Sequence, residues 1–204
     1  MINKNYNFVE ECPATCQLLT EIFLHAGFKI DIEIADLLML GLISDSGNFT
    51  HSDVSYKTYE IAAKLRKCGA DVNKINYQVF SRQTKRRALL FGKVIHNIRF
   101  ALEDRLAFLT VPLDYFGSEG VESSITEGFV DFPLSIDGVE VAVSLLEVKK
   151  HQYKVSFRSK GKVDVNAVAG VFGGGGHILA SGCMLNGELE EVIDKITYAV
   201  YQNI

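Results

Sequence analysis

Four consecutive glycines and the histidine after them, Gly173–Gly176 and His177, are the residues of this sequence best suited to holding an anion. Each glycine widens the unfolded ensemble and weakens a fold, so four in a row need a reason. The simplest reason is a main chain that approaches a ligand closely, with its N–H groups free to point at phosphate oxygens. His177 would donate to the same phosphate. A bare glycine run, taken alone, favours a flexible turn.

The residues upstream of the glycines favour the phosphate interpretation. Arg158 and Ser159 stand at the end of an expected strand. The planar guanidinium of arginine can donate two parallel hydrogen bonds to a phosphate, and a serine hydroxyl can donate another. Asp164 and Asn166 open the helix that leads into the glycines. The predicted substrate contacts are Arg158, Ser159, Asn166, Gly173, Gly174, Gly175, Gly176 and His177.

The elements that must position these residues change character near residue 98. Before it, hydrophobic periodicity predicts helices, and after it a mixture of strands and helices. Lys85, Arg86 and Arg87, at the start of the last helix of the first part, favour a solvated face over a ligand contact. The predicted helices span 13–26, 31–42, 55–67, 81–97, 116–132, 164–171 and 188 onward, with a further short helix capped by Asp71. The helix at 31–42 is apolar on most sides, so we expect it to be buried. The predicted strands span 98–102, 106–111, 139–148, 153–158 and 182–185.

Composition narrows the function classes. Nearly half of the 204 residues are apolar, which suits a protein with a real core. The net charge of −4 argues against a broad basic face for duplex nucleic acid, but leaves room for a local basic pocket. No signal peptide is visible, and the longest apolar stretch, near Ala35–Ile43, is too short to cross a bilayer. The four cysteines form no C-x-x-C pair, so we expect reduced thiols in the cytoplasm and no membrane partner.

The run Phe157–Cys183 resembles the DHH-associated domain of the DHH phosphoesterases, whose hallmark is Arg-Ser, a helix, Gly-Gly-Gly-Gly-His and a small-residue turn. It is most similar to the NrnA-like oligoribonucleases, which also dephosphorylate phosphoadenosine phosphate, and to the RecJ-type exonucleases. By this resemblance, Arg158, Ser159, the glycines and His177 grip the phosphate and terminal nucleotide of the substrate. The implied fold is α/β: a helical remnant of a DHH domain (1–80), a linker helix (81–97) and a small α/β DHH-associated domain with a mixed sheet (98–204).

The segment Gly41–Phe49 is similar to the family's fourth catalytic motif, Gly-Ile-x-x-Asp-Thr/Ser-Gly-x-Phe, in which the aspartate binds manganese. The resemblance therefore implies that Asp45 is a catalytic residue and metal ligand and that Mn²⁺ is the cofactor. Hard oxygen ligands suit Mn²⁺ or Mg²⁺, although an isolated aspartate in such a turn is more often a cap.

The family's remaining metal ligands have no counterpart in this sequence. They come from an early His-x-x-x-Asp-x-Asp motif, another aspartate and an Asp-His-His motif. One aspartate cannot hold two metal ions. We therefore expect the chain to correspond to the later two-thirds of the family's length, through a mis-assigned start, a frameshift or a split gene.

Three functions stay open at this point. In the first, the complete protein is a manganese-dependent hydrolase of short single-stranded oligonucleotides or phosphoadenosine phosphate; this chain binds the substrate phosphate, and an upstream chain completes the site. In the second, the chain is a non-catalytic module that binds a nucleotide or a single-stranded nucleic acid end. In the third, the glycines form a turn in an α/β domain of unrelated function. A homodimer is also left open.

Overall fold

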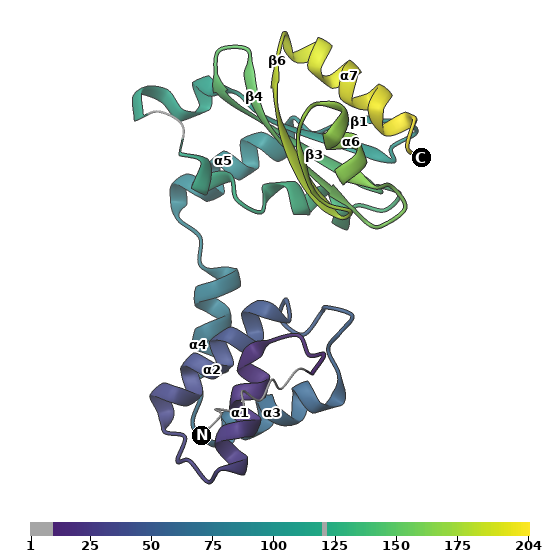
Figure 1. Ribbon diagram of the computed structural model, residues 1–204. Coiled ribbons are helices and arrows are strands. Elements are labelled where there is room, and N and C mark those ends of the chain that lie inside the picture. The colour runs from purple at the N-terminus through teal and green to yellow at the C-terminus, as the bar shows by residue number, and fades with distance from the viewer. Residues whose placement is uncertain (1–9, 120–121) are drawn as a thin grey trace, which may run out of the picture. The chain divides into compact units, whose positions relative to one another are not determined.

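The first eighty residues contain helices and the rest of the chain contains a sheet, as Figure 1 shows for this computed structural model. The structure describes residues 10–119 and 122–204. Contacts divide the chain into two units, Met1–Arg82 and Gln83–Ile204, and each unit has hydrophobic clusters of its own. Within the described residues, no helix is both long enough and apolar enough to span a bilayer.

The first unit is built from short helices that begin at polar caps. The side chain of Asp31 accepts a hydrogen bond from the N–H of Ile34 (2.9 Å), and that of Asp71 from the N–H of Lys74 (3.0 Å), which confirms the predicted cap at Asp71. The helices are α1 (Thr15–His25), α2 (Ile32–Asp45), α3 (Tyr56–Lys67) and α4 (Val72–Asn76), followed by a π-helical turn, η1 (Tyr77–Ser81).

The prediction that the apolar helix near 31–42 is buried on most sides is wrong for one side of α2. Helices α1, α3 and α4 pack against it and bury Leu38, Leu42 and Ile43. Leu37, in contrast, is 67% exposed. The apolar stripe of α2 is therefore wider than the surface that its neighbours in this unit cover.

The second unit begins at helix α5 (Lys85–His96), four residues later than predicted. Thr84 accepts a hydrogen bond from the N–H of Arg87 (3.1 Å) and so caps α5, which separates it from the turn η1. After α5 come the strands β1 (Arg99–Ala101), β2 (Leu106–Val111), β3 (Val141–Lys149), β4 (Gln152–Ser159), β5 (Gly175–His177) and β6 (Ala180–Asn186), and the helices α6 (Val165–Val171) and α7 (Leu189–Tyr201).

The six strands form one sheet in the order β1-β2-β3-β4-β6-β5. Strands β2 and β3 are parallel, and the other pairs are antiparallel, so the sheet is mixed and the α/β class is confirmed. Strand β5 was not predicted. Its three residues pair with β6 and end the sheet at the glycine run.

The two faces of this sheet are covered differently. One face carries Val143, Val155 and Phe157 and packs against α6 and α7 along its length. The other face packs against α5 over β2 and against the segment after β2, which covers β2 and β3 and reaches part of β4 through residues 129–135. Strand β4 therefore alternates between buried and partly exposed residues, because its second face is not covered by a helix.

The segment that partly covers this second face is not the α-helix predicted for 116–132. It forms the 3₁₀ turns η2 (Leu113–Glu119), η3 (Ser123–Thr126) and η4 (Phe129–Ser135). Gly117 and Gly128 have left-handed φ angles of 59° and 76°, and Pro133 lies inside η4. Left-handed glycines and a proline interrupt an α-helix, which explains why the segment breaks into turns.

Candidate functional site

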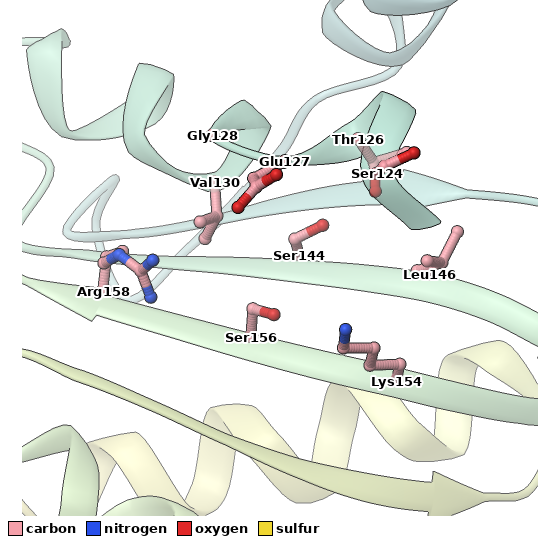
Figure 2. Close-up of a pocket in the computed structure, with 10 residues that line it drawn as sticks. All are labelled: Ser124, Thr126, Glu127, Gly128, Val130, Ser144, Leu146, Lys154, Ser156 and Arg158. Carbon is pink, nitrogen blue, oxygen red and sulfur yellow. The ribbon is translucent and has the colours of Figure 1, made fainter. Parts of the chain in front are cut away.

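A pocket of about 400 Å³ lies on the second face of the sheet, where strand β4 emerges from beneath η3 and η4. Figure 2 shows side chains from β3 and β4 forming its floor and the segment around η3 forming the opposite wall. The lining residues are Ser124, Thr126, Glu127, Gly128, Val130, Ser144, Leu146, Lys154, Ser156 and Arg158.

Arg158 lies at one end of this pocket and is held in place by two neighbours. Its Nε donates to Oδ1 of Asp131 (2.9 Å), and its Nη1 donates to the carbonyl oxygen of Phe157 (3.0 Å). The side chain of Arg158 is 34% exposed. Its Nη2 donates to no residue in the described part of the chain, so one edge of the guanidinium is available for a ligand oxygen.

Three further polar residues share the floor with Arg158. Lys154 and Ser156 precede it at alternate positions of β4, and Ser144 of β3 is the register partner of Ser156. None of the three side chains has a hydrogen-bond or ion-pair partner within residues 10–119 and 122–204. The sequence interpretation missed them, although a polar residue at every second position of a strand was the available signal.

The opposite wall of the pocket is fixed by Arg87 from α5. Its Nη1 donates to the carbonyl oxygen of Ile125, and its Nη2 donates to that of Glu127 (2.6 Å). The guanidinium also lies 4.7 Å from the ring centre of Phe129. Arg87 is therefore a structural clamp for the wall, and interpreting its side chain as a solvated charge was wrong.

Three N–H groups of the glycine run donate to acceptors within the chain. The N–H of Gly173 donates to the carbonyl oxygen of Gly170 (3.0 Å) and that of Gly174 to the carbonyl oxygen of Ala169 (2.9 Å). The N–H of Gly176 donates to Oδ1 of Asn166 (2.8 Å). These three N–H groups end α6 and hold the loop, so the expectation that the glycine N–H groups are free for a phosphate is wrong for them.

Close packing accounts for Gly174 and Gly176, and backbone conformation accounts for Gly173. Gly173 has φ +73°, which L-residues with side chains adopt only at a cost. A Cβ on Gly174 would lie 2.5 Å from Cβ of Cys183, and one on Gly176 would lie 2.5 Å from the carbonyl oxygen of Ala180. A Cβ on Gly175 would have space, because its nearest neighbour would be Oδ1 of Asn166 at 3.6 Å, and one on Gly173 would meet nothing within 4 Å. The run therefore lets β5 lie directly against β6.

His177 and Arg158 belong to the same face of the sheet. Arg158 pairs with Ala180 of β6, and Ala180 pairs with His177 of β5. Directly paired residues project from the same face, and two strand spacings put these two positions about 10 Å apart. His177 is exposed, the residue between the two is the small Ala180, and the next residue of β6 on this face is Gly182. The register thus brings both predicted contacts to one open surface.

Two predicted contacts have structural partners of their own. Ser159 is buried and, by register with Val141, faces the α6–α7 side of the sheet; its Oγ accepts a hydrogen bond from the N–H of Gly161 (3.0 Å). Asn166 uses its Oδ1 to hold Gly176. The structure therefore places the hydroxyl of Ser159 away from the pocket and gives Asn166 a positioning role.

Comparison with known proteins identifies this second unit. Residues 104–203 match the DHHA1 domain family. The chain is 27% identical over 192 residues to the bifunctional oligoribonuclease and PAP phosphatase NrnA of Thermus thermophilus, a match that covers 94% of this chain and 57% of that protein. It is 28% identical over 173 residues to the protein of the same name from Bacillus subtilis, with 83% and 54% covered. The chain belongs to the DHH family of phosphoesterases.

A solved structure of similar fold supports the same assignment. The exopolyphosphatase-related protein of Bacteroides fragilis matches this DHH-family chain with a TM-score of 0.83 and 29% identity, over 94% of this chain and 57% of that one. The chain thus spans just over half the length of the relatives it matches.

The predicted metal ligand of this DHH-family chain, Asp45, lies exposed at the end of α2. The turn after it is conformationally strained, because Asn48 and Phe49 have left-handed φ angles of 56° and 65°. Ser46 is buried, and its Oγ accepts a hydrogen bond from the N–H of Phe49 (3.1 Å). Burial, and secondarily the charge of Asp45, raises the pKa of the Cys16 thiol.

The described residues do not fit a two-metal centre. Within residues 10–119 and 122–204, no group of three or more His, Cys, Asp or Glu side chains is placed to hold a metal ion. His51, which follows the Asp45 turn, packs against the backbone of Gly47. Asp45 therefore has too few partners in this part of the DHH-family chain to bind the predicted metal pair.

Proposed function

We propose that the pocket of the DHHA1 domain binds the phosphate and terminal nucleotide of a short single-stranded oligonucleotide, or of a nucleotide phosphate such as phosphoadenosine phosphate. The observation that carries this proposal is the free edge of Arg158, which opens into a cavity with hydroxyl groups on its floor. Charged hydrogen bonds from an arginine are the usual way to hold a phosphate. The names of the NrnA relatives, oligoribonuclease and PAP phosphatase, agree with such substrates.

His177 and Gly175 extend this proposed surface toward the edge of the sheet. Both lie on the face of Arg158 by register, and neither is covered. A nucleoside bound across the small residues between them would place its phosphate at Arg158 and its other end at His177. This keeps Arg158, His177 and Gly175 of the predicted contacts as ligand contacts, with Asn166 and the other glycines supporting them.

We propose that hydrolysis is carried out by the complete protein and not by the described residues alone. Phosphodiester or phosphate hydrolysis with Mn²⁺ would require ligands beyond Asp45, since the described residues hold no metal cluster. We propose that this chain supplies the substrate grip and Asp45, and that an upstream segment or chain supplies the other ligands. The free cysteines agree with a location in the reducing cytoplasm.

A second candidate is a module that binds nucleotides without cleaving them. The observation that favours it is the same lack of a metal cluster within the described residues. An assay with a 5′-phosphorylated dinucleotide and added Mn²⁺ separates the two candidates, with this chain and an upstream-extended form run in parallel. Cleavage by the extended form alone is expected, and binding without cleavage by both forms would favour the module.

The binding proposal is tested by replacing Arg158. Calorimetric titration of Arg158→Ala with AMP in EDTA should show at least several-fold weaker binding, and about 10- to 150-fold if a full charged hydrogen bond of roughly 1.5–3 kcal/mol is lost. Arg158→Lys should recover part of the affinity, because lysine keeps the positive charge but cannot donate two parallel hydrogen bonds as a guanidinium does.

The matched control is Arg99→Ala. Arg99 lies on β1 and pairs with Glu190 (2.7 Å), so this change removes an arginine and an ion pair of the same domain outside the pocket. It should leave AMP binding unchanged. Equal binding by wild type and by a folded Arg158→Ala, His177→Ala double variant would refute the proposal and favour a glycine turn of unrelated function.

A further inference from the structure

We propose that the Lys154 end of the pocket binds a second phosphate of the substrate, separate from the one at Arg158. This inference rests on the proposed function, because it assumes that the first phosphate binds at Arg158. It narrows the substrate class to ligands with two phosphates, and it assigns a role to side chains that the predicted site did not contain.

The spacing of the two cations supports separate anions. Lys154 and Arg158 are four residues apart on β4 and face the same cavity (Figure 2). At about 3.3 Å per residue, their backbones are about 13 Å apart. Arg158 cannot swing toward Lys154 without leaving Asp131 and the carbonyl oxygen of Phe157. One phosphate is therefore poorly placed to bind both side chains.

The floor between the two cations is suited to the chain that joins two phosphates. Ser156 lies midway on β4, and Ser144 lies beside it on β3. Ser144 is 7% exposed, and its hydroxyl is open to the cavity and has no hydrogen-bond partner within the described residues. Ribose or phosphate oxygens of a ligand would supply such a partner.

The charges around the cavity agree with an anion on its floor. The cross-strand neighbours of Lys154 are Leu146 and Met184, and its ammonium group has no acidic partner in the described part of the chain. The one acidic lining residue, Glu127, comes from the opposite wall. A phosphate on the floor therefore meets Lys154 first, while Glu127 is placed to accept hydrogen bonds from a sugar or base.

The test compares ligands with one and two phosphates on the whole chain. Wild type and Lys154→Gln are titrated in EDTA with AMP, with 3′-phosphoadenosine 5′-phosphate and with the dinucleotide pApA. Wild type should bind at least one of the two-phosphate ligands more tightly than AMP. Lys154→Gln should bind AMP as wild type does and lose about three- to tenfold in affinity for that ligand.

The two larger ligands identify the source of the second phosphate. A loss restricted to 3′-phosphoadenosine 5′-phosphate assigns the subsite to a 3′-phosphate of one nucleotide. A loss restricted to pApA assigns it to the bridging phosphate of an oligonucleotide. Lys150→Gln is the control, because Lys150 lies in the β3–β4 turn outside the pocket and carries the same charge.

The remaining outcomes separate this inference from the proposed function. If Arg158→Ala weakens AMP but Lys154→Gln weakens no ligand selectively, the second subsite is refuted and the proposed function stands. Equal losses for AMP and the two-phosphate ligands in Lys154→Gln also refute it, because Lys154 would then belong to the first phosphate site. If Arg158→Ala changes nothing, the proposed function itself fails.

Discussion

Cys183 links the core of the sheet to the glycine run. It lies on β6, is 9% exposed and faces the α6–α7 side, where a Cβ on Gly174 would collide with it. Burial raises the pKa of the Cys183 thiol to about 11. The thiol therefore stays protonated at neutral pH, and the thiolate that reacts with alkylating reagents is scarce.

The buried thiol of Cys183 leads to a prediction about its reactivity. At pH 7 to 8, iodoacetamide should label Cys12 and Cys68, which are partly exposed, well before Cys183. Peptide mass spectrometry over a time course measures the three rates. Labelling of Cys183 in the folded chain as fast as that of Cys12 would contradict the buried, protonated thiol.

The raised pKa of the Cys183 thiol also sets the sign of a pH effect on stability. The folded state holds the Cys183 proton up to about pH 11, whereas the unfolded chain releases it near the ordinary value of 9.0. Between these values the folded state binds more protons, so the contribution of Cys183 to the free energy of unfolding falls as pH rises from about 9 to 11. Below pH 9 this contribution is constant.

At the scale of elements, the loop from α6 to β6 depends on the absence of side chains at particular positions. Gly174→Ala forces a Cβ against Cys183 and the backbone of β6 and should lower the free energy of unfolding by about 1–3 kcal/mol. Gly175→Ala is the matched control, because its Cβ has space, and it should change stability by less than about 1 kcal/mol.

Urea unfolding followed by circular dichroism measures both variants. The difference between them is the informative quantity, since both remove one glycine from the same run and have similar effects on the unfolded chain. Equal destabilisation by the two changes would mean that flexibility of the whole run, rather than the contact of Gly174 with β6, determines stability.

Some elements could be predicted from the sequence and others could not. Strands β2 and β3 are mostly apolar runs, β4 alternates between buried and more exposed residues, and helix α7 has helical periodicity, so the local pattern was sufficient for these elements. Strand β5 consists of two glycines and a histidine, and only pairing with β6 makes it a strand. The 3₁₀ turns near 116–132 depend on left-handed glycines, whose conformation a sequence does not display.

The sequence likewise indicated only part of the candidate site. The sequence indicated Arg158 and His177 because an arginine, a glycine run and a histidine in that order match a family pattern, and the register places the two residues on one face. The bonds already made by the glycine N–H groups could not be predicted, because they depend on how α6 ends. Lys154 was missed because its place in the pocket follows from which face of β4 stays uncovered.

At the scale of the whole molecule, the hydrophobic clusters of the two units share no residues. The clusters of the sheet unit lie between residues 90 and 200, and that of the helical unit lies between 14 and 75. Residues 83–204, expressed alone, should therefore fold and bind AMP within about twofold of the whole chain, since distant sites are usually additive. Thermal unfolding and calorimetric titration of this shorter protein measure both properties.

A shorter protein that folds but binds AMP more than about tenfold more weakly would show that the helical unit contributes to the ligand site. Failure to fold would show that the sheet unit depends on residues before Gln83. Either result would contradict the independence of the two units.

The sheet has very short outer strands, and this affects how copies of the protein can associate. Strand β1 and strand β5 have three residues each, and β5 contains the glycines of the site. Such stubs offer few unpaired main-chain groups as a template for another strand. Addition of a further strand to β1 or β5 is thereby discouraged, and a dimer of this chain would not be held together by pairing these two short strands.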